Sequence, residues 1–191
     1  MAPIPPVRRV VTTHTGSGVA TVQNVADLEV KPAAGFDGVQ TTSVWCTGAV
    51  PSKDNGNGCV LSSPFPLPTE SLIDYRHRRS DGSSRVPDGD LGIVHRNGAH
   101  CMMTVLGPGK SVVMHRSSSL DLNILISGKL ILVMEDGSEE LVEEPGSVVV
   151  QRGTLHAWRN PGPEYTRWMC MLIDAEPVVV DGKPLPVEAR A

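Results

Sequence analysis

The chain reads GKSVVMHRSSSLDLNILISG from Gly109 to Gly128 and GSVVVQRGTLHAWRN from Gly146 to Asn160. Both segments are rich in β-branched and aliphatic residues, which favour strands. From Leu91 onward, similar short runs recur at intervals of about ten residues, separated by turn dipeptides such as Ser127-Gly128 and Asp136-Gly137. Connections this short join antiparallel strands, since a parallel crossover needs a dozen or more residues. The pattern predicts an all-β fold with one antiparallel barrel or jelly roll.

Length and composition are consistent with one domain. The 191 residues are enough for one buried core, and the 19 glycines and 16 prolines are typical of a turn-rich β protein. We expect N-terminal strands and loops that pack on the barrel over residues 1–90, the barrel core over residues 91–176 and a C-terminal tail over residues 177–191. Within the first part, Arg8–Val25 is typical of a hairpin, and residues 51–90 are rich in loop signals.

Charge and hydropathy exclude several classes of partner. A formal net charge of -4 gives no general attraction to nucleic acid or to an anionic membrane. No apolar run approaches the roughly 18 residues of a membrane span, and the N-terminus carries prolines and arginines where a signal peptide is apolar. We therefore expect a cytoplasmic protein without nucleic-acid or membrane partners. The four cysteines form no C-x-x-C pair, so they predict neither a zinc knuckle nor a redox motif.

Strand alternation predicts where the polar side chains of the two quoted segments meet. Residues two apart in a strand point to the same side, so His115 shares a face with Ser117 and His156 shares a face with Trp158. If both faces line one barrel, these groups converge inside it together with Asp121. Two imidazoles and one carboxylate are the minimum for a divalent metal with open coordination positions.

The first segment resembles the first cupin motif. That motif runs glycine, five residues, His-x-His, three or four residues, glutamate, six residues and glycine. Gly109, His115 and Gly128 keep this spacing. Ser117 stands where the motif has its second histidine, and Asp121 stands where it has glutamate.

The second segment resembles the second cupin motif, which runs proline-x-glycine, two residues, histidine, three residues and asparagine. Gly153, His156 and Asn160 keep their places, and Gln151 replaces the proline. Apart from residues 51–90, the whole chain is similar to small single-domain proteins of the cupin 2 conserved-barrel family, a bacterial and fungal group in which several members are associated with natural-product or aromatic-degradation pathways.

The resemblance implies a small-molecule lyase or isomerase that acts by decarboxylation, dehydration or isomerisation of a small cyclic or polyketide-like acid. It implies His115, Asp121 and His156 as catalytic residues, and the same three as ligands of one divalent metal, with zinc, iron, nickel and manganese not distinguished. Because aspartate is one methylene shorter than glutamate, Asp121 falls about 1 Å short of the glutamate position. The alternative is a pocket without metal, in which the carboxylate raises the pKa of a neighbouring histidine.

Two further readings of the same residues stay open. One is a non-catalytic small-molecule-binding cupin, and the other is a metal-dependent dioxygenase. In either case the substrate-binding residues predicted by strand parity are Trp158, Asn123, Ser117, Leu125 and Met103. Trp158 either stacks on an aromatic substrate or fills the core.

Two predictions concern residues outside the motifs. The resemblance implies a homodimer, in which the strand from Arg8 to Thr13 is a candidate to add to a neighbour's sheet edge. We interpret the remaining histidines as surface or structural residues, and the arginines that alternate with the motif residues as external: His14, His77, His95, His100, Arg116, Arg152 and Arg159.

Overall fold

The computed structural model describes residues 3–33, 35–52, 93–94 and 96–190. Of the predicted loop region 51–90, residues 53–90 lie outside these ranges, as do His77 and His95. The described part of the chain is built of strands and turns, and every strand pair in it is antiparallel, which confirms the predicted all-β fold. No helix in these ranges is long and apolar enough to cross a membrane.

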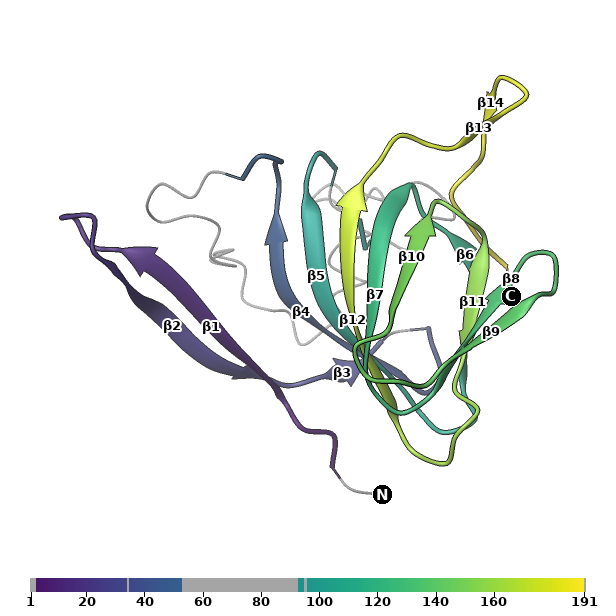
Figure 1. Ribbon diagram of the computed structural model, residues 1–191, viewed down its shortest axis with the longest axis horizontal. Coiled ribbons are helices and arrows are strands. Elements are labelled where there is room, and N and C mark those ends of the chain that lie inside the picture. Colours follow the sequence, from purple (N-terminus) through teal and green to yellow (C-terminus); the bar gives the residue numbers. More distant parts are fainter. Residues whose placement is uncertain (1–2, 34, 53–92, 95, 191) are drawn as a thin grey trace.

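Two sheets face each other and enclose the core (Figure 1). The six-stranded sheet has the order β10 (Val148–Arg152), β7 (Ser119–Ser127), β12 (Thr166–Asp174), β5 (Ala99–Leu106), β4 (Val39–Thr47) and β3 (Lys31–Pro32). The five-stranded sheet has the order β15 (Glu188–Arg190), β6 (Ser111–Arg116), β11 (His156–Arg159), β8 (Leu130–Met134) and β9 (Glu139–Val142). Two separate hairpins pair β1 (Val7–His14) with β2 (Ala20–Leu28) and β13 (Val179–Val180) with β14 (Lys183–Pro184).

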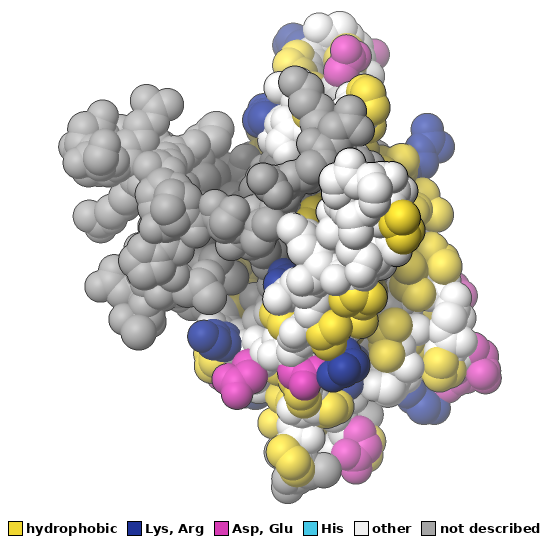
Figure 2. All heavy atoms as spheres, turned by 90° about the vertical axis from the view of Figure 1, so that its left-hand side faces the viewer, with side chains coloured by type: hydrophobic (Ala, Val, Ile, Leu, Met, Phe, Trp, Pro, Cys, Tyr) yellow, Lys and Arg dark blue, Asp and Glu magenta, His cyan; other side chains and the backbone are white. Residues whose placement is uncertain are grey.

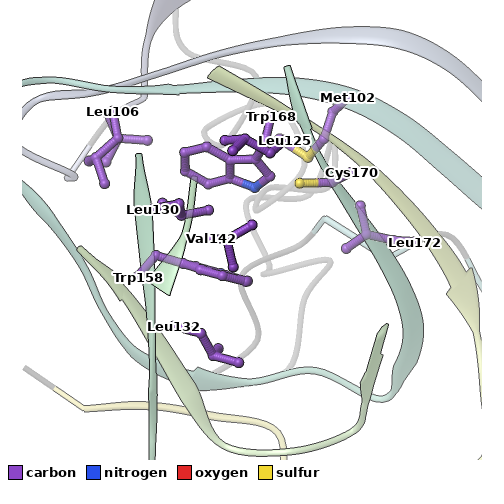
Figure 3. Close-up of a cluster of buried hydrophobic side chains, with 11 residues drawn as sticks. Met102, Leu106, Leu125, Leu130, Leu132, Val142, Trp158, Trp168, Cys170 and Leu172 are labelled. Carbon is purple, nitrogen blue, oxygen red and sulfur yellow. The ribbon is translucent and has the colours of Figure 1, made fainter. Parts of the chain in front are cut away.

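Two tryptophans join the sheets across the core. Trp158 of β11 and Trp168 of β12 come from opposite sheets, and their ring centroids lie 6.0 Å apart. Figure 3 shows Leu106, Leu125 and other aliphatic side chains around them. Since large aromatic side chains dominate the energetics of a core, this contact helps to hold the two sheets together.

Two motif residues, Asn160 and Gly128, stabilise the backbone of the barrel and do not line the cavity. The fully buried side-chain amide of Asn160 donates to the carbonyls of Leu106, Gly107 and Glu164, so it ties the end of β11 to the turn after β5. Gly128 has a φ of 83°, and a Cβ at this position would lie 2.7 Å from the carbonyl oxygen of Tyr165. Only glycine fits this backbone conformation and this approach.

The N-terminal hairpin and the C-terminus differ in how they join the barrel. The β1–β2 hairpin extends away from the barrel (Figure 1), and its Val10, Val22 and Val25 are exposed. Figure 2, which faces this side of the molecule, shows hydrophobic side chains on its surface. At the other end, residues 188–190 form β15 and pair with β6, so the predicted tail contains a strand of the barrel.

Strand alternation predicted that Arg116 is external, but in the structure it is not. It points away from the cavity but is buried, because β15 covers it and Glu188 of that strand pairs with its guanidinium at 2.7 Å. Glu135 of the turn after β8 lies 3.5 Å from the same guanidinium.

Candidate functional site

A cavity of about 130 Å³ lies between the two sheets. Its walls combine aromatic and aliphatic side chains with a few polar groups, as small-molecule sites do. The lining residues are Ala33, Phe36, Val39, Thr41, Ser43, Ile93, His100, Met102, Thr104, Val112, His115, Asp121, Asn123, His156, Trp158, Trp168, Cys170 and Leu172.

His115 and His156 form a pair on the wall made by β6 and β11. They lie opposite each other in the register of the two strands, and their ring centroids are 4.3 Å apart. His115 Nδ1 lies 2.8 Å from the Val113 carbonyl, and His156 Nδ1 lies 2.9 Å from the Thr154 carbonyl. Because a carbonyl only accepts, each Nδ1 carries the proton and each Nε2 carries a lone pair. Within the described ranges neither Nε2 has a hydrogen-bond partner.

Burial keeps both imidazoles neutral. It lowers the pKa of His115, and it lowers the pKa of His156 to about 3, with the neighbouring His115 as a second cause. The expectation that a carboxylate raises the pKa of a histidine here is therefore wrong. Asp121 lies on the opposite sheet, and removal of the rings from water dominates their titration.

Asp121 faces the same cavity from β7. Its side chain is buried, and its Oδ1 has no hydrogen-bond partner. Burial raises the pKa of this carboxyl to about 6, and a hydrogen bond from Ser119 acts in the opposite direction. A carboxyl group with a pKa near neutrality can both accept and return a proton at physiological pH.

The predicted metal ligands only partly fit a metal. Two neutral imidazoles with free Nε2 lone pairs, each oriented by a backbone carbonyl, are suitable ligands. However, no three His, Cys, Asp or Glu side chains of the described residues gather closely enough to hold an ion. The carboxylate of Asp121 comes from the facing sheet and does not complete the set, so the residues present do not fit the predicted three-ligand centre.

Of the five predicted substrate-binding residues, Trp158 and Asn123 line the cavity and three do not. Ser117 hydrogen-bonds the Ser119 hydroxyl at 2.8 Å, and Leu125 belongs to the core cluster. Met103 is buried but does not line the cavity, whereas its neighbour Met102 does, because adjacent residues of a strand point to opposite sides.

His100 is a cavity residue that sequence reasoning missed. It lies on β5 and is buried, not exposed. Its Nδ1 lies 2.9 Å from the Ile93 carbonyl, and its Nε2 lies 2.9 Å from the Ser43 hydroxyl. Strand alternation could have indicated this position, since His100 and Met102 are two residues apart and so share a face of β5.

Comparison with known proteins identifies the barrel. Residues 102–172 match the family model described as "Cupin domain". This segment is a cupin domain. For these residues the predicted resemblance to the cupin 2 family is confirmed, and both quoted motifs lie within the match.

Curated relatives of this cupin come from fungi. Oryzines biosynthesis cluster protein J of Aspergillus oryzae is 29% identical over 182 residues, which cover 95% of this chain and 90% of that protein. Phomopsin biosynthesis cluster protein D of Diaporthe leptostromiformis is 35% identical over 97 residues, which cover 49% of this chain and 50% of that protein. The cupin-domain-containing oxidoreductase virC of Hypocrea virens is 35% identical over 88 residues, which cover 44% of this chain and 45% of that protein. The chain thus aligns with about half the length of the last two.

Among solved structures, a cupin 2 conserved barrel domain protein from Salinispora arenicola aligns with 78% of this chain and 92% of that one. The TM-score is 0.41 and the sequence identity is 17%.

Proposed function

We propose that this cupin is a small-molecule enzyme that moves protons on an oxygenated, partly apolar substrate. The observation that carries the proposal is the arrangement of unpaired groups in one cavity: the Nε2 lone pairs of His115 and His156 on one wall, and Asp121 Oδ1 on the other. The names of the relatives, which place them in biosynthesis clusters, support a substrate from secondary metabolism.

The geometry favours acid–base chemistry by Asp121 on a molecule that the two histidines orient. The Asp121 carboxylate, whose pKa of about 6 makes it a stronger base than His156 with its pKa of about 3, removes a proton from a carbon next to a carbonyl, or from a hydroxyl, and the protonated carboxyl then gives this proton to an oxygen or a carbon of the same molecule. The Nε2 atoms of His115 and His156 accept hydrogen bonds from its hydroxyl groups. Dehydration and isomerisation of a cyclic or polyketide-like molecule both follow this scheme, and decarboxylation ends with the same protonation of carbon. General acid–base catalysis of this kind contributes typically about 10²–10⁴-fold in rate.

Proton transfer can be tested with a panel of cyclic hydroxyketones. Purified protein is mixed with each compound in D₂O, and deuterium incorporation and the formation of a conjugated enone are followed by NMR. We expect turnover of at least one compound, with a loss of 100-fold or more in Asp121→Asn and in His156→Gln. His14→Gln, on the exposed hairpin, is the matched control and keeps full activity. Equal rates for the wild type and both cavity variants would refute the roles given to these residues.

A second candidate is metal-dependent oxidation, because several relatives are named cupin-domain-containing oxidoreductases. Metal analysis of the purified protein by mass spectrometry separates the two candidates. A fully active preparation without metal eliminates the redox candidate. If the wild type binds a ligand but turns over no compound, and the Asp121→Asn and His156→Gln variants bind that ligand as tightly, the protein is a binding protein and not an enzyme.

We also propose that the protein is a homodimer. The proposal is supported by the β1–β2 hairpin, which extends from the barrel with exposed valines and an outer edge of β1 that pairs with no strand of the described residues.

A further inference from the structure

Three hydrogen-bond acceptors without a protein donor among the described residues line the cavity. His115 Nε2, His156 Nε2 and Asp121 Oδ1 accept, and none of them has a protein donor within the described ranges. The buried indole Nε1 of Trp168 and the side-chain amide of Asn123 are neutral donors on the same cavity. Since an unpaired buried acceptor costs free energy, a ligand that brings hydrogen-bond donors to these atoms gains affinity.

Among the described residues that line the cavity, none is Lys or Arg, and the imidazoles of His115 and His156 are neutral. A carboxylate or phosphate would lose its hydration without a compensating charge and would lie near the Asp121 carboxyl. These surroundings disfavour an ionised acid.

The cavity has room for about one ring. A cavity of roughly 150 Å³ holds benzene, and the present one is about 130 Å³. Its walls include flat and aliphatic side chains such as Phe36, Val112 and Trp158, which pack against an apolar ring.

We propose that the ligand is a neutral, single-ring molecule with at least two hydroxyl groups, phenolic or enolic, on different edges of the ring. One hydroxyl donates to the pair of His115 and His156, and another donates to Asp121 on the opposite wall. The inference rests on the proposed function, because it takes the same cavity as the substrate site. It narrows the reactions considered above to dehydration and isomerisation, since decarboxylation starts from an ionised acid.

Three small probes test this class by isothermal titration calorimetry at pH 7.5. They are 1,3-dihydroxybenzene, the similarly sized 1,3-dimethylbenzene, which has no donors, and 3-hydroxybenzoate, which is ionised at this pH. We expect 1,3-dihydroxybenzene to bind at least tenfold more tightly than either of the others. Tighter or equal binding of the dimethyl compound, tighter or equal binding of the benzoate, or no binding of any probe would overturn the proposal.

A variant then locates the donor–acceptor contact. Asp121→Leu should weaken the binding of 1,3-dihydroxybenzene about tenfold, whereas 1,3-dimethylbenzene should bind as tightly as before or more tightly. His14→Leu on the hairpin should change neither affinity. Equal weakening of both probes by Asp121→Leu would contradict the assigned contact. Binding of these probes does not depend on turnover, so a failed preference overturns the ligand class alone, and the hydroxyketone assay separately decides whether the protein is an enzyme.

Discussion

His115 and His156 face each other across β6 and β11 with their ring centroids 4.3 Å apart, and each Nδ1 is hydrogen-bonded to the carbonyl two residues earlier in its own strand. The two bonds fix the same tautomer in both rings. Both Nε2 atoms are therefore acceptors at one wall of the cavity, opposite the carboxyl of Asp121.

Asp121 should destabilise the protein at neutral pH. Its pKa is about 6 in the folded state and near 3.8 in an unfolded chain, so between these values the folded state binds more protons and stability rises as pH falls. Asp121→Asn removes this dependence and should raise the free energy of unfolding at pH 7.5 by on the order of 2–3 kcal/mol, with the gain vanishing near pH 4.

Chemical denaturation of both proteins at several pH values measures this difference. The comparison with the variant is needed because His156 has the opposite effect on the pH dependence of stability. Its pKa is lowered in the folded state, so its contribution to the free energy of unfolding is lost as pH falls below 6.5. Asp181→Asn, in an exposed turn, is the control variant. A gain for Asp121→Asn that does not change with pH would contradict the shifted titration.

Asn160 should matter for stability more than for chemistry. Asn160→Ala removes the donor of three hydrogen bonds, to the carbonyls of Leu106, Gly107 and Glu164, and an unsatisfied buried group costs about 1–3 kcal/mol. We expect a loss of about 3 kcal/mol in the free energy of unfolding, measured in urea. Asn24→Ala, on the exposed face of β2, should change it by less than about 0.5 kcal/mol. Similar losses in the two variants would show that the contacts of Asn160 do not stabilise the barrel.

Substitutions at Gly128 and Gly137 distinguish the cost of a positive φ from the cost of a steric clash between a Cβ and neighbouring atoms. Their φ angles are 83° and 84°, but a Cβ would contact the Tyr165 carbonyl at Gly128 and nothing within 4 Å at Gly137. Gly137→Ala should cost about 1 kcal/mol, from the positive φ alone. Gly128→Ala should cost at least about 2 kcal/mol more, because the backbone must also move. Thermal unfolding followed by circular dichroism measures both, and equal costs would mean that the close approach is relieved without strain.

The proposed homodimer depends on the N-terminal strand. Removal of residues 1–13 deletes nearly all of β1, and we expect the mass measured by light scattering to fall from that of a dimer to that of a monomer. Removal of residues 1–5, which lie before β1, is the control and should leave the mass unchanged. A shortened protein that keeps the dimer mass would exclude strand exchange through β1.

Part of the site could be predicted because strand alternation is a local property. Residues two apart share a face whatever the rest of the chain does, so His156 and Trp158 were expected on one face and both line the cavity. The same rule could not choose between Met102 and Met103. Both are apolar, and the facing of β5 depends on which side of it meets the opposite sheet.

The sequence by itself determined the class of fold, the antiparallel order of short strands and the cupin motifs, because turn residues and a two-residue period act over a few neighbouring positions. Only the tertiary structure decided that residues 188–190 add a strand beside β6 and that His100 joins the cavity. It also decided that burial lowers the pKa of the histidines and raises the pKa of Asp121. These features depend on groups far apart in the chain, and on how much water the packed sheets exclude, which no local pattern encodes.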